Sequence, residues 1–320
     1  MIDIAAVILV LAAGAAWLNR RWLGLPPTIG VMVVALAGSL VIVALERFGL
    51  GMPLAQERAL LSSIDFSRVL MEGMLSVLLF AGSLHVDLAR LVRLARPIGV
   101  LALVGTVLSA LLVGAGCHWL SGLLGLGLPL VHCLLFGAIV SPTDPVAVLG
   151  ILESARVPRD VEATIAGESL VNDGVGVVLF ALLLDMLGSG HAPTWGEGLR
   201  LLVHEAGGGI VLGACVGWIV NRVLASIDDY RVEVLITLAA VVGAWALAEH
   251  LATSGPLAMV VIGLLVGSEG RAWSMSAVTR ERLDLFWHLL DEILNAVLFV
   301  LIGLEFAVVE YTPEIGRAHV

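Results

Sequence analysis

Ten stretches of the chain are almost continuously apolar, and short polar segments separate them. They cover residues 4–18, 28–45, 69–89, 98–120, 129–153, 161–187, 200–224, 231–250, 255–268 and 284–309. A helix needs about 20 residues to cross the hydrocarbon core of a bilayer. Most of these stretches are long enough, although the first and the ninth are short. The pattern predicts an all-α protein that crosses a membrane about ten times.

Two of the apolar stretches carry acids near their middle. Residues 129–153 contain Ser141-Pro142-Thr143-Asp144-Pro145, and residues 161–187 contain Glu168, Ser169, Asn172 and Asp173. An acid at the centre of a bilayer costs roughly 2.5 kcal/mol or more to insert, so acids found there mark functional sites by default. We therefore expect the chemistry of the protein to reside in these two stretches.

The prolines at positions 142 and 145 predict an interruption of the helix formed by residues 129–153. Proline has no N–H group, so the carbonyls of Ala138 and Ser141 lose their helical partners, and the residue before each proline is pushed out of the helical conformation. Interrupted backbone at membrane depth must be satisfied by protein or by a water-filled cavity, and a bound cation is one way to satisfy it. The alternative is a proline-kinked helix beside an ordinary one, but a kink does not require three buried acids.

The polar residues of the other stretch share one face of a helix. Ser169 precedes Asn172 by three residues and Asp173 by four, and side chains at these spacings are neighbours on a helix. Small residues let a second backbone approach a membrane helix closely. Here the small residues are Gly167, Gly174 and Gly176.

Composition and charge agree with a membrane protein. The 320 residues are 59% hydrophobic and 14% charged, with a mean hydropathy of +1.04. All 17 basic residues are arginine; with Arg317 set aside, twelve lie in loops after odd-numbered stretches and four after even-numbered ones. This bias predicts that the odd loops are cytoplasmic and the N-terminus is outside. Nucleic-acid binding is not indicated, and Cys117, Cys133 and Cys215 lack ligand spacing and are expected to be inert.

The motifs SPTDPVAV (141–148) and GESLVNDGVGVVLF (167–180) resemble those of the monovalent cation:proton antiporter family, the NhaP-like sodium/proton exchangers. Residues 78–88 and 289–305 extend the resemblance over nearly the whole chain. The resemblance implies an inverted-repeat fold in which interrupted helices cross and hold a cation between them. It also implies no cofactor, a homodimer when full length, and a place in the inner membrane of a bacterium.

The resemblance further assigns roles to the polar residues. Asp173 would carry either the cation or the proton, and Ser169 and the Thr143 carbonyl would be further oxygen ligands of sodium. Asn172 and Asp144 would shape and polarise the site. Because an asparagine precedes the aspartate, the chain resembles the electroneutral members.

By the same resemblance, Glu168 would pair with an arginine from a later helix. Relatives can also place an acid on the third helix near Phe80, and this chain has none there.

A faint internal symmetry predicts the domain plan. Residues 72–78 resemble residues 292–298, so the third stretch is similar to the tenth in an inverted repeat. We expect a first repeat at 1–187, a linking helix at 200–224 and a partial second repeat at 231–309. About 10 of the 13 family helices would then be present. The last residues, 314–320, resemble the translation of a common sequencing adapter, so we expect a truncated chain with a non-native tail after Pro313.

The resulting prediction is a sodium (or potassium):proton antiporter, not an enzyme, in which cation and proton compete for Asp173 and the site opens alternately to each side. One alternative is a sodium-coupled solute symporter of the same fold, and another is an inactive fragment. An intramembrane aspartyl hydrolase using Asp144 and Asp173 is a third, but the chain has no Gly-x-Gly-Asp motif.

Overall fold

The structure is a computed structural model in which residues 2–47, 73–143, 157–189, 196, 200, 203–270 and 276–308 are described. The described chain is helical and contains no β-strand. Seven of its helices are long and apolar enough to cross a membrane: 6–23, 27–45, 95–123, 159–188, 203–224, 230–250 and 277–304. Shorter apolar helices occupy 75–84, 130–140 and 255–268. Each of the ten predicted stretches therefore contains a helix, and the all-α membrane architecture is confirmed.

The chain divides into two compact units, and the first combines Met1–Leu78 with Asp284–Tyr311. It contains α1 (Ile2–Leu18), a π-helical turn (Asn19–Leu23), α2 (Pro27–Arg47) and most of α17 (Ala277–Val308). Val31 and Val300 are buried in its core. At Gly303 a methyl group would lie 2.6 Å from the Ala35 Cβ, so α2 and α17 touch where a side chain is missing.

The second unit comprises Leu79–Leu283 with Thr312–Val320. Its helices are α6 (Leu88–Arg93), α7 (Ala95–Val100), α8 (Thr106–Leu123), α9 (Leu130–Val140), α11 (Arg159–Ser189), α13 (Gly208–Leu224), α14 (Tyr230–His250) and α15 (Gly255–Leu265). A π-helical turn at Leu101–Gly105 precedes α8, and another at Val203–Gly207 precedes α13. A third, at Val266–Gly270, follows α15. Helix α5 (Leu75–Leu84) runs into this unit from the first.

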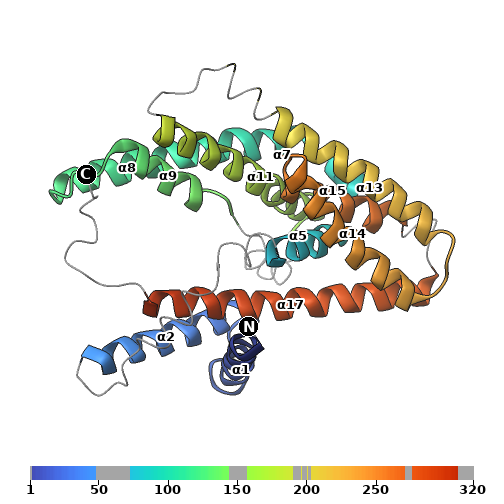
Figure 1. Cartoon of the computed structure of the whole chain (residues 1–320), viewed down its shortest axis with the longest axis horizontal. Coiled ribbons are helices and arrows are strands. Elements are labelled where there is room, and N and C mark those ends of the chain that lie inside the picture. The colour runs from blue at the N-terminus through green and yellow to red at the C-terminus, as the bar shows by residue number, and fades with distance from the viewer. Residues whose placement is uncertain are drawn as a thin grey trace. The chain divides into compact units, whose positions relative to one another are not determined.

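Glycines determine how the helices of the second unit pack. A methyl group at Gly137 of α9 would lie 2.3 Å from the Ala110 carbonyl oxygen of α8, and Figure 1 shows these two helices side by side. A methyl group at Gly213 of α13 would lie 2.7 Å from the Ala258 carbonyl oxygen of α15. Close backbone contact of this kind favours helix association in a membrane, where no hydrophobic effect drives helices together.

Candidate functional site

Helix α9 ends at Val140, immediately before the Ser141-Pro142 pair. The N–H of Ser141 still donates to the Gly137 carbonyl at 3.0 Å, and the Ser141 hydroxyl donates to the same oxygen at 2.7 Å. Pro142 cannot continue this ladder because it has no N–H. The structure therefore places the end of α9 immediately before this proline. Asp144 and Pro145, which were predicted to contribute to the same break, lie outside the described residues.

Helix α11 carries the other predicted residues on one uninterrupted helix of 31 residues. Ser169 is 2% exposed and Asn172 is fully buried, whereas Glu168 and Asp173 are half-buried. The long helix therefore positions these side chains within little more than one turn.

Thr143 brings the end of α9 to this face of α11. The hydroxyl of Ser169 donates to the Thr143 carbonyl oxygen. The Asn172 Nδ2 donates to the Thr143 hydroxyl at 2.9 Å and to Glu168 Oε1 at 2.8 Å, and the Thr143 hydroxyl donates to Glu168 Oε2 at 3.3 Å. Four of the predicted site residues are thus joined in one network.

Glu168 accepts its hydrogen bonds from Asn172 and Thr143 within the described part of the chain. The arginine partner from a later helix that the family resemblance implies stays a prediction.

The network fixes the orientation of the Asn172 amide. Its nitrogen has two N–H groups, and acceptors on Thr143 and Glu168 take both of them. The amide oxygen must then point the other way, and it is buried with no hydrogen-bond partner in the described part of the chain. An unpaired buried carbonyl costs roughly 1–3 kcal/mol, so this oxygen is a candidate ligand for a cation.

A glycine allows the close approach of the two helices. A methyl group at Gly176 would lie 2.4 Å from the Pro142 ring. The proline that ends α9 therefore packs directly on α11, one helical turn after Asn172; its ring is the closest group to this glycine, and the Ala138 carbonyl oxygen of α9 follows at 3.7 Å. Nearby, a methyl group at Gly174 would lie 2.9 Å from the Leu257 side chain of α15.

The chemistry of the donor set suits a hard cation. The available oxygens are a backbone carbonyl, a hydroxyl and an amide, on or against the helix that also carries Asp173, and hard cations prefer oxygen ligands. Among the described residues no group of three or more His, Cys, Asp or Glu side chains could hold a metal ion.

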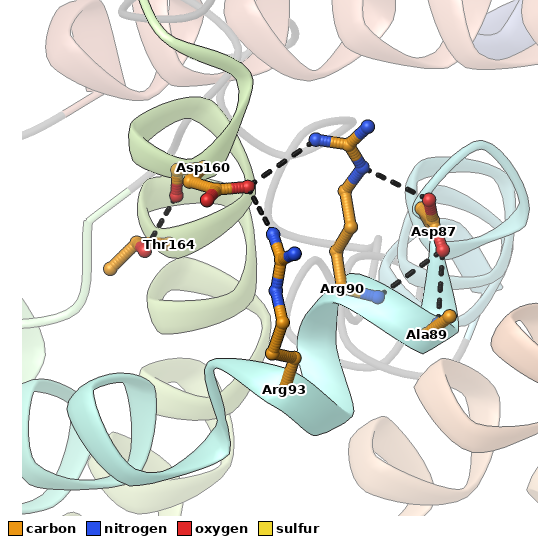
Figure 2. Close-up of polar contacts among 6 residues, drawn as sticks. All are labelled: Asp87, Ala89, Arg90, Arg93, Asp160 and Thr164. Atoms are coloured by element: carbon orange, nitrogen blue, oxygen red, sulfur yellow. Dashed lines mark hydrogen bonds and ion pairs between the residues drawn. The ribbon is translucent and has the colours of Figure 1, made fainter.

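An ion-pair cluster holds the first turn of α11, as Figure 2 shows. Asp160 accepts from the Arg93 guanidinium and, at 3.4 Å, from Arg90, and both arginines come from α6. Asp87 caps α6 by accepting from the N–H groups of Ala89 and Arg90 at 3.0 and 3.3 Å. The sequence pattern indicated these arginines only as markers of membrane orientation. It missed the ion pairs because Asp160 lies about 70 residues further along the chain.

The Asp87 carboxyl, which lies outside the membrane-spanning helices, has a pKa below its ordinary value. The main cause is the hydrogen bond from the Arg90 N–H, with further contributions from the Arg90 guanidinium and the Ala89 N–H. Because hydrogen bonds to the ionised form favour it, they outweigh the small opposing effect of burial.

Sequence comparison places this site in a known family. Residues 7–316 match the family described as sodium/hydrogen exchanger, transmembrane. The chain belongs to this family. It is 46% identical, over 98% of its length, to the Na(+)/H(+) antiporter NhaP of Pseudomonas aeruginosa and covers 74% of that protein. It is 34% identical, over 78% of its length, to the Na(+)/H(+) antiporter NhaH of Halobacillus dabanensis and covers 61% of it.

A solved structure of the sodium proton antiporter MjNhaP1 from Methanocaldococcus jannaschii shares the fold of the chain. The TM-score is 0.70 at 23% sequence identity, and the match covers 95% of this chain and 69% of that one. The predicted family and antiporter fold are confirmed. The relatives in this exchanger family are transporters, not enzymes.

Proposed function

We propose that the chain is the ion-translocating part of an electroneutral sodium (or potassium):proton antiporter. The observation that carries the proposal is the buried Asn172 amide oxygen, which has no hydrogen-bond partner among the described residues, on a side chain whose nitrogen donates to the Thr143 hydroxyl beside the interrupted backbone. Together with the Thr143 carbonyl and the Ser169 hydroxyl, this oxygen supplies neutral ligands next to the Asp173 carboxyl. The family of the chain and the names of its relatives support sodium and protons as the transported ions.

Exchange follows from competition at Asp173. A carboxylate among neutral oxygens can be neutralised by a sodium ion or by a proton, but not by both at once. Loading one ion therefore releases the other, and one singly charged cation exchanged for one proton moves no net charge. Glu168 keeps the Asn172 nitrogen turned away from the ion, and we assign to Asp144 the polarising role that the family resemblance implies.

Alternating access completes the cycle. Interrupted helices near the midplane let a transporter expose one site to each side in turn by rigid-body movement of one part. The bias of the arginines supports a cytoplasmic position for the odd loops and an external N-terminus. We further propose that the protein resides in a bacterial inner membrane as a homodimer.

The test is proton flux in proteoliposomes that contain the full-length protein and a pH-sensitive dye. A sodium or potassium gradient, with no organic solute, is expected to drive proton movement in the parent, and Asp173→Asn is expected to abolish it. Asp185→Asn is the matched control, because Asp185 lies on the same helix but is exposed. Sodium-driven proton flux that persists in Asp173→Asn would refute the assignment. A requirement for an organic solute would indicate the symporter alternative.

A further inference from the structure

The second unit also contains a fully buried acid, Glu233, which lies far along the chain from Asp173. Glu233 lies in the first turn of α14 and is 0% exposed. The buried residues of α14 are spaced by three or four and form one stripe: Glu233, Thr237, Val241, Ala244 and Ala248. Such a stripe is the face that a helix packs against its neighbours. Glu233 therefore occupies a core position that an apolar residue would normally fill.

Neither carboxyl oxygen of Glu233 has a hydrogen-bond partner in the part of the chain that the structure describes. A buried acid in a folded protein is normally paired or hydrogen-bonded, because an isolated ionised carboxylate in an apolar place costs several kcal/mol. Without a donor, the group needs a proton or a cation.

The surrounding charges do not supply that cation. Helix α15, which packs on α14, has no charged residue, and the single charged residue of α13, Arg222, lies over the Trp218 ring at 5.6 Å. The connection before α14 adds two acids, Asp228 and Asp229.

The other charged residues near this end of α14 also form no ion pair with Glu233 among the described residues. Arg231, on the same helix, lies 5.6 Å from the Tyr230 ring and donates to its hydroxyl. The first turn of α17 carries Arg280, Glu281 and Arg282. Its Thr279 hydroxyl donates at 3.0 Å to Asp228, which lies in the connection between α13 and α14. None of these arginines forms an ion pair with Glu233 among the described residues. With these arginines excluded, a proton is the ligand left for Glu233 among the groups that the structure describes.

We propose that Glu233 is a second proton-binding site, separate from the Asp173 site, which holds a proton in this packing and sets how exchange responds to pH. The inference rests on the proposed function. When Glu233 loses its proton, the carboxylate must reach water or a donor, so the first turn of α14 must move away from its neighbours. Protonation of Glu233 thus stabilises the packing of α14 against α13 and α15, and loss of the proton favours a different packing of these helices.

This position also assigns a side of the membrane to the response. The connection from α13 to α14 is one of the odd-numbered loops in which the arginines concentrate, so Glu233 responds to cytoplasmic pH.

The first test compares Glu233→Gln with the parent in proteoliposomes. Glutamine keeps the shape of the protonated acid but cannot ionise. Glu233→Gln is expected to keep its maximal exchange rate within about twofold and to lose most of the change in rate with the pH on that side. The matched control is Glu281→Gln, which removes an exposed acid nearby, and it is expected to keep the parental pH profile. An unchanged profile in Glu233→Gln would overturn the proposal.

The second test detects the proton without transport. Dicyclohexylcarbodiimide is an apolar reagent that modifies protonated carboxyl groups, and mass spectrometry can locate the adduct. Labelling of Glu233 is expected to fall as pH rises, to be insensitive to sodium and to persist in Asp173→Asn. No adduct at Glu233 at any pH would contradict the proposal, as would an adduct unaffected by pH. A parent protein that shows no exchange but labels as expected would refute the antiporter assignment and leave this site standing.

Discussion

Two glutamates of the same unit lie in apolar helices, yet their surroundings are opposite. Glu168 is half-buried, and each of its carboxyl oxygens accepts a hydrogen bond, one from Asn172 and one from Thr143. Glu233 is fully buried, and neither of its oxygens accepts a hydrogen bond from any described residue. Hydrogen bonds to a carboxylate stabilise its charge, whereas burial without donors destabilises it. The first acid can therefore act as a fixed charge that orients Asn172, and the second as a group that gains and loses a proton.

Replacing each acid by methionine should give the sharpest contrast. Methionine is close to glutamate in length and favours helix, but it accepts no comparable hydrogen bond. Glu168→Met leaves the Asn172 and Thr143 donors unpaired, at about 1–3 kcal/mol for each, and should lower the melting temperature. Glu233→Met removes an unpaired buried acid and should be neutral or stabilising by about 1–4 kcal/mol.

The measurement is thermal unfolding of both variants in the same detergent at neutral pH. Each variant is the control for the other, because the substitution is identical and only the surroundings differ. Equal destabilisation by the two substitutions would mean that the difference in hydrogen bonding does not determine the roles of these acids.

A glycine substitution on α11 should weaken the hydrogen bonds around Glu168 and leave the surroundings of Glu233 unchanged. In Gly176→Ala the new methyl group would lie 2.4 Å from the Pro142 ring. The end of α9 would have to shift, and Thr143 would move with it away from Glu168 and Asn172. We expect a loss of roughly 1–3 kcal/mol in stability together with reduced sodium-driven exchange.

Gly188→Ala is the control for this change. Gly188 lies on the same helix, and a methyl group there would meet nothing within 4 Å. It should be neutral or stabilising by about 0.5–1 kcal/mol. If both alanine variants exchange sodium at the parental rate, the contact of Pro142 with α11 does not hold the site together.

The smallest effect is expected at Asp87, a carboxyl that has donors but little burial. Its pKa lies below the ordinary value of about 3.9 because the Arg90 N–H, the Arg90 side chain and the Ala89 N–H donate to it. For a lowered pKa, the stabilising contribution is present above the unfolded-state pKa and is lost as pH falls through the folded-state pKa. The side chain is 53% exposed, so this contribution is at most about 1 kcal/mol.

The corresponding experiment follows the melting temperature between pH 6 and roughly pH 3, a range that brackets the ordinary aspartate pKa. The parent should lose slightly more stability at the acid end than Asp87→Asn, which keeps a capping oxygen but does not titrate. Parallel curves for the two proteins would show that the hydrogen bonds to Asp87 do not favour its ionised form.

Much of the candidate site follows from the sequence because its constraints are local. A proline removes an N–H wherever it stands, so the end of α9 before Pro142 was predictable. The spacing of Ser169 and Asn172 places them on one helical face, and both are buried. Apolar length alone located all ten helical segments.

The tertiary structure decided which oxygens have partners. Glu168 takes one N–H group of Asn172 from the same helix, but only the approach of Thr143 to α11 occupies the other, so that the amide oxygen has no partner among the described residues. In the sequence, Glu233 is an ordinary acid in the first turn of a helix, where it would normally be solvated and stabilised by the helix dipole. Its burial depends on how α13 and α15 pack around α14. Hydrophobic spacing determines which helices form, but the free energy of each polar group depends on atoms from distant parts of the chain.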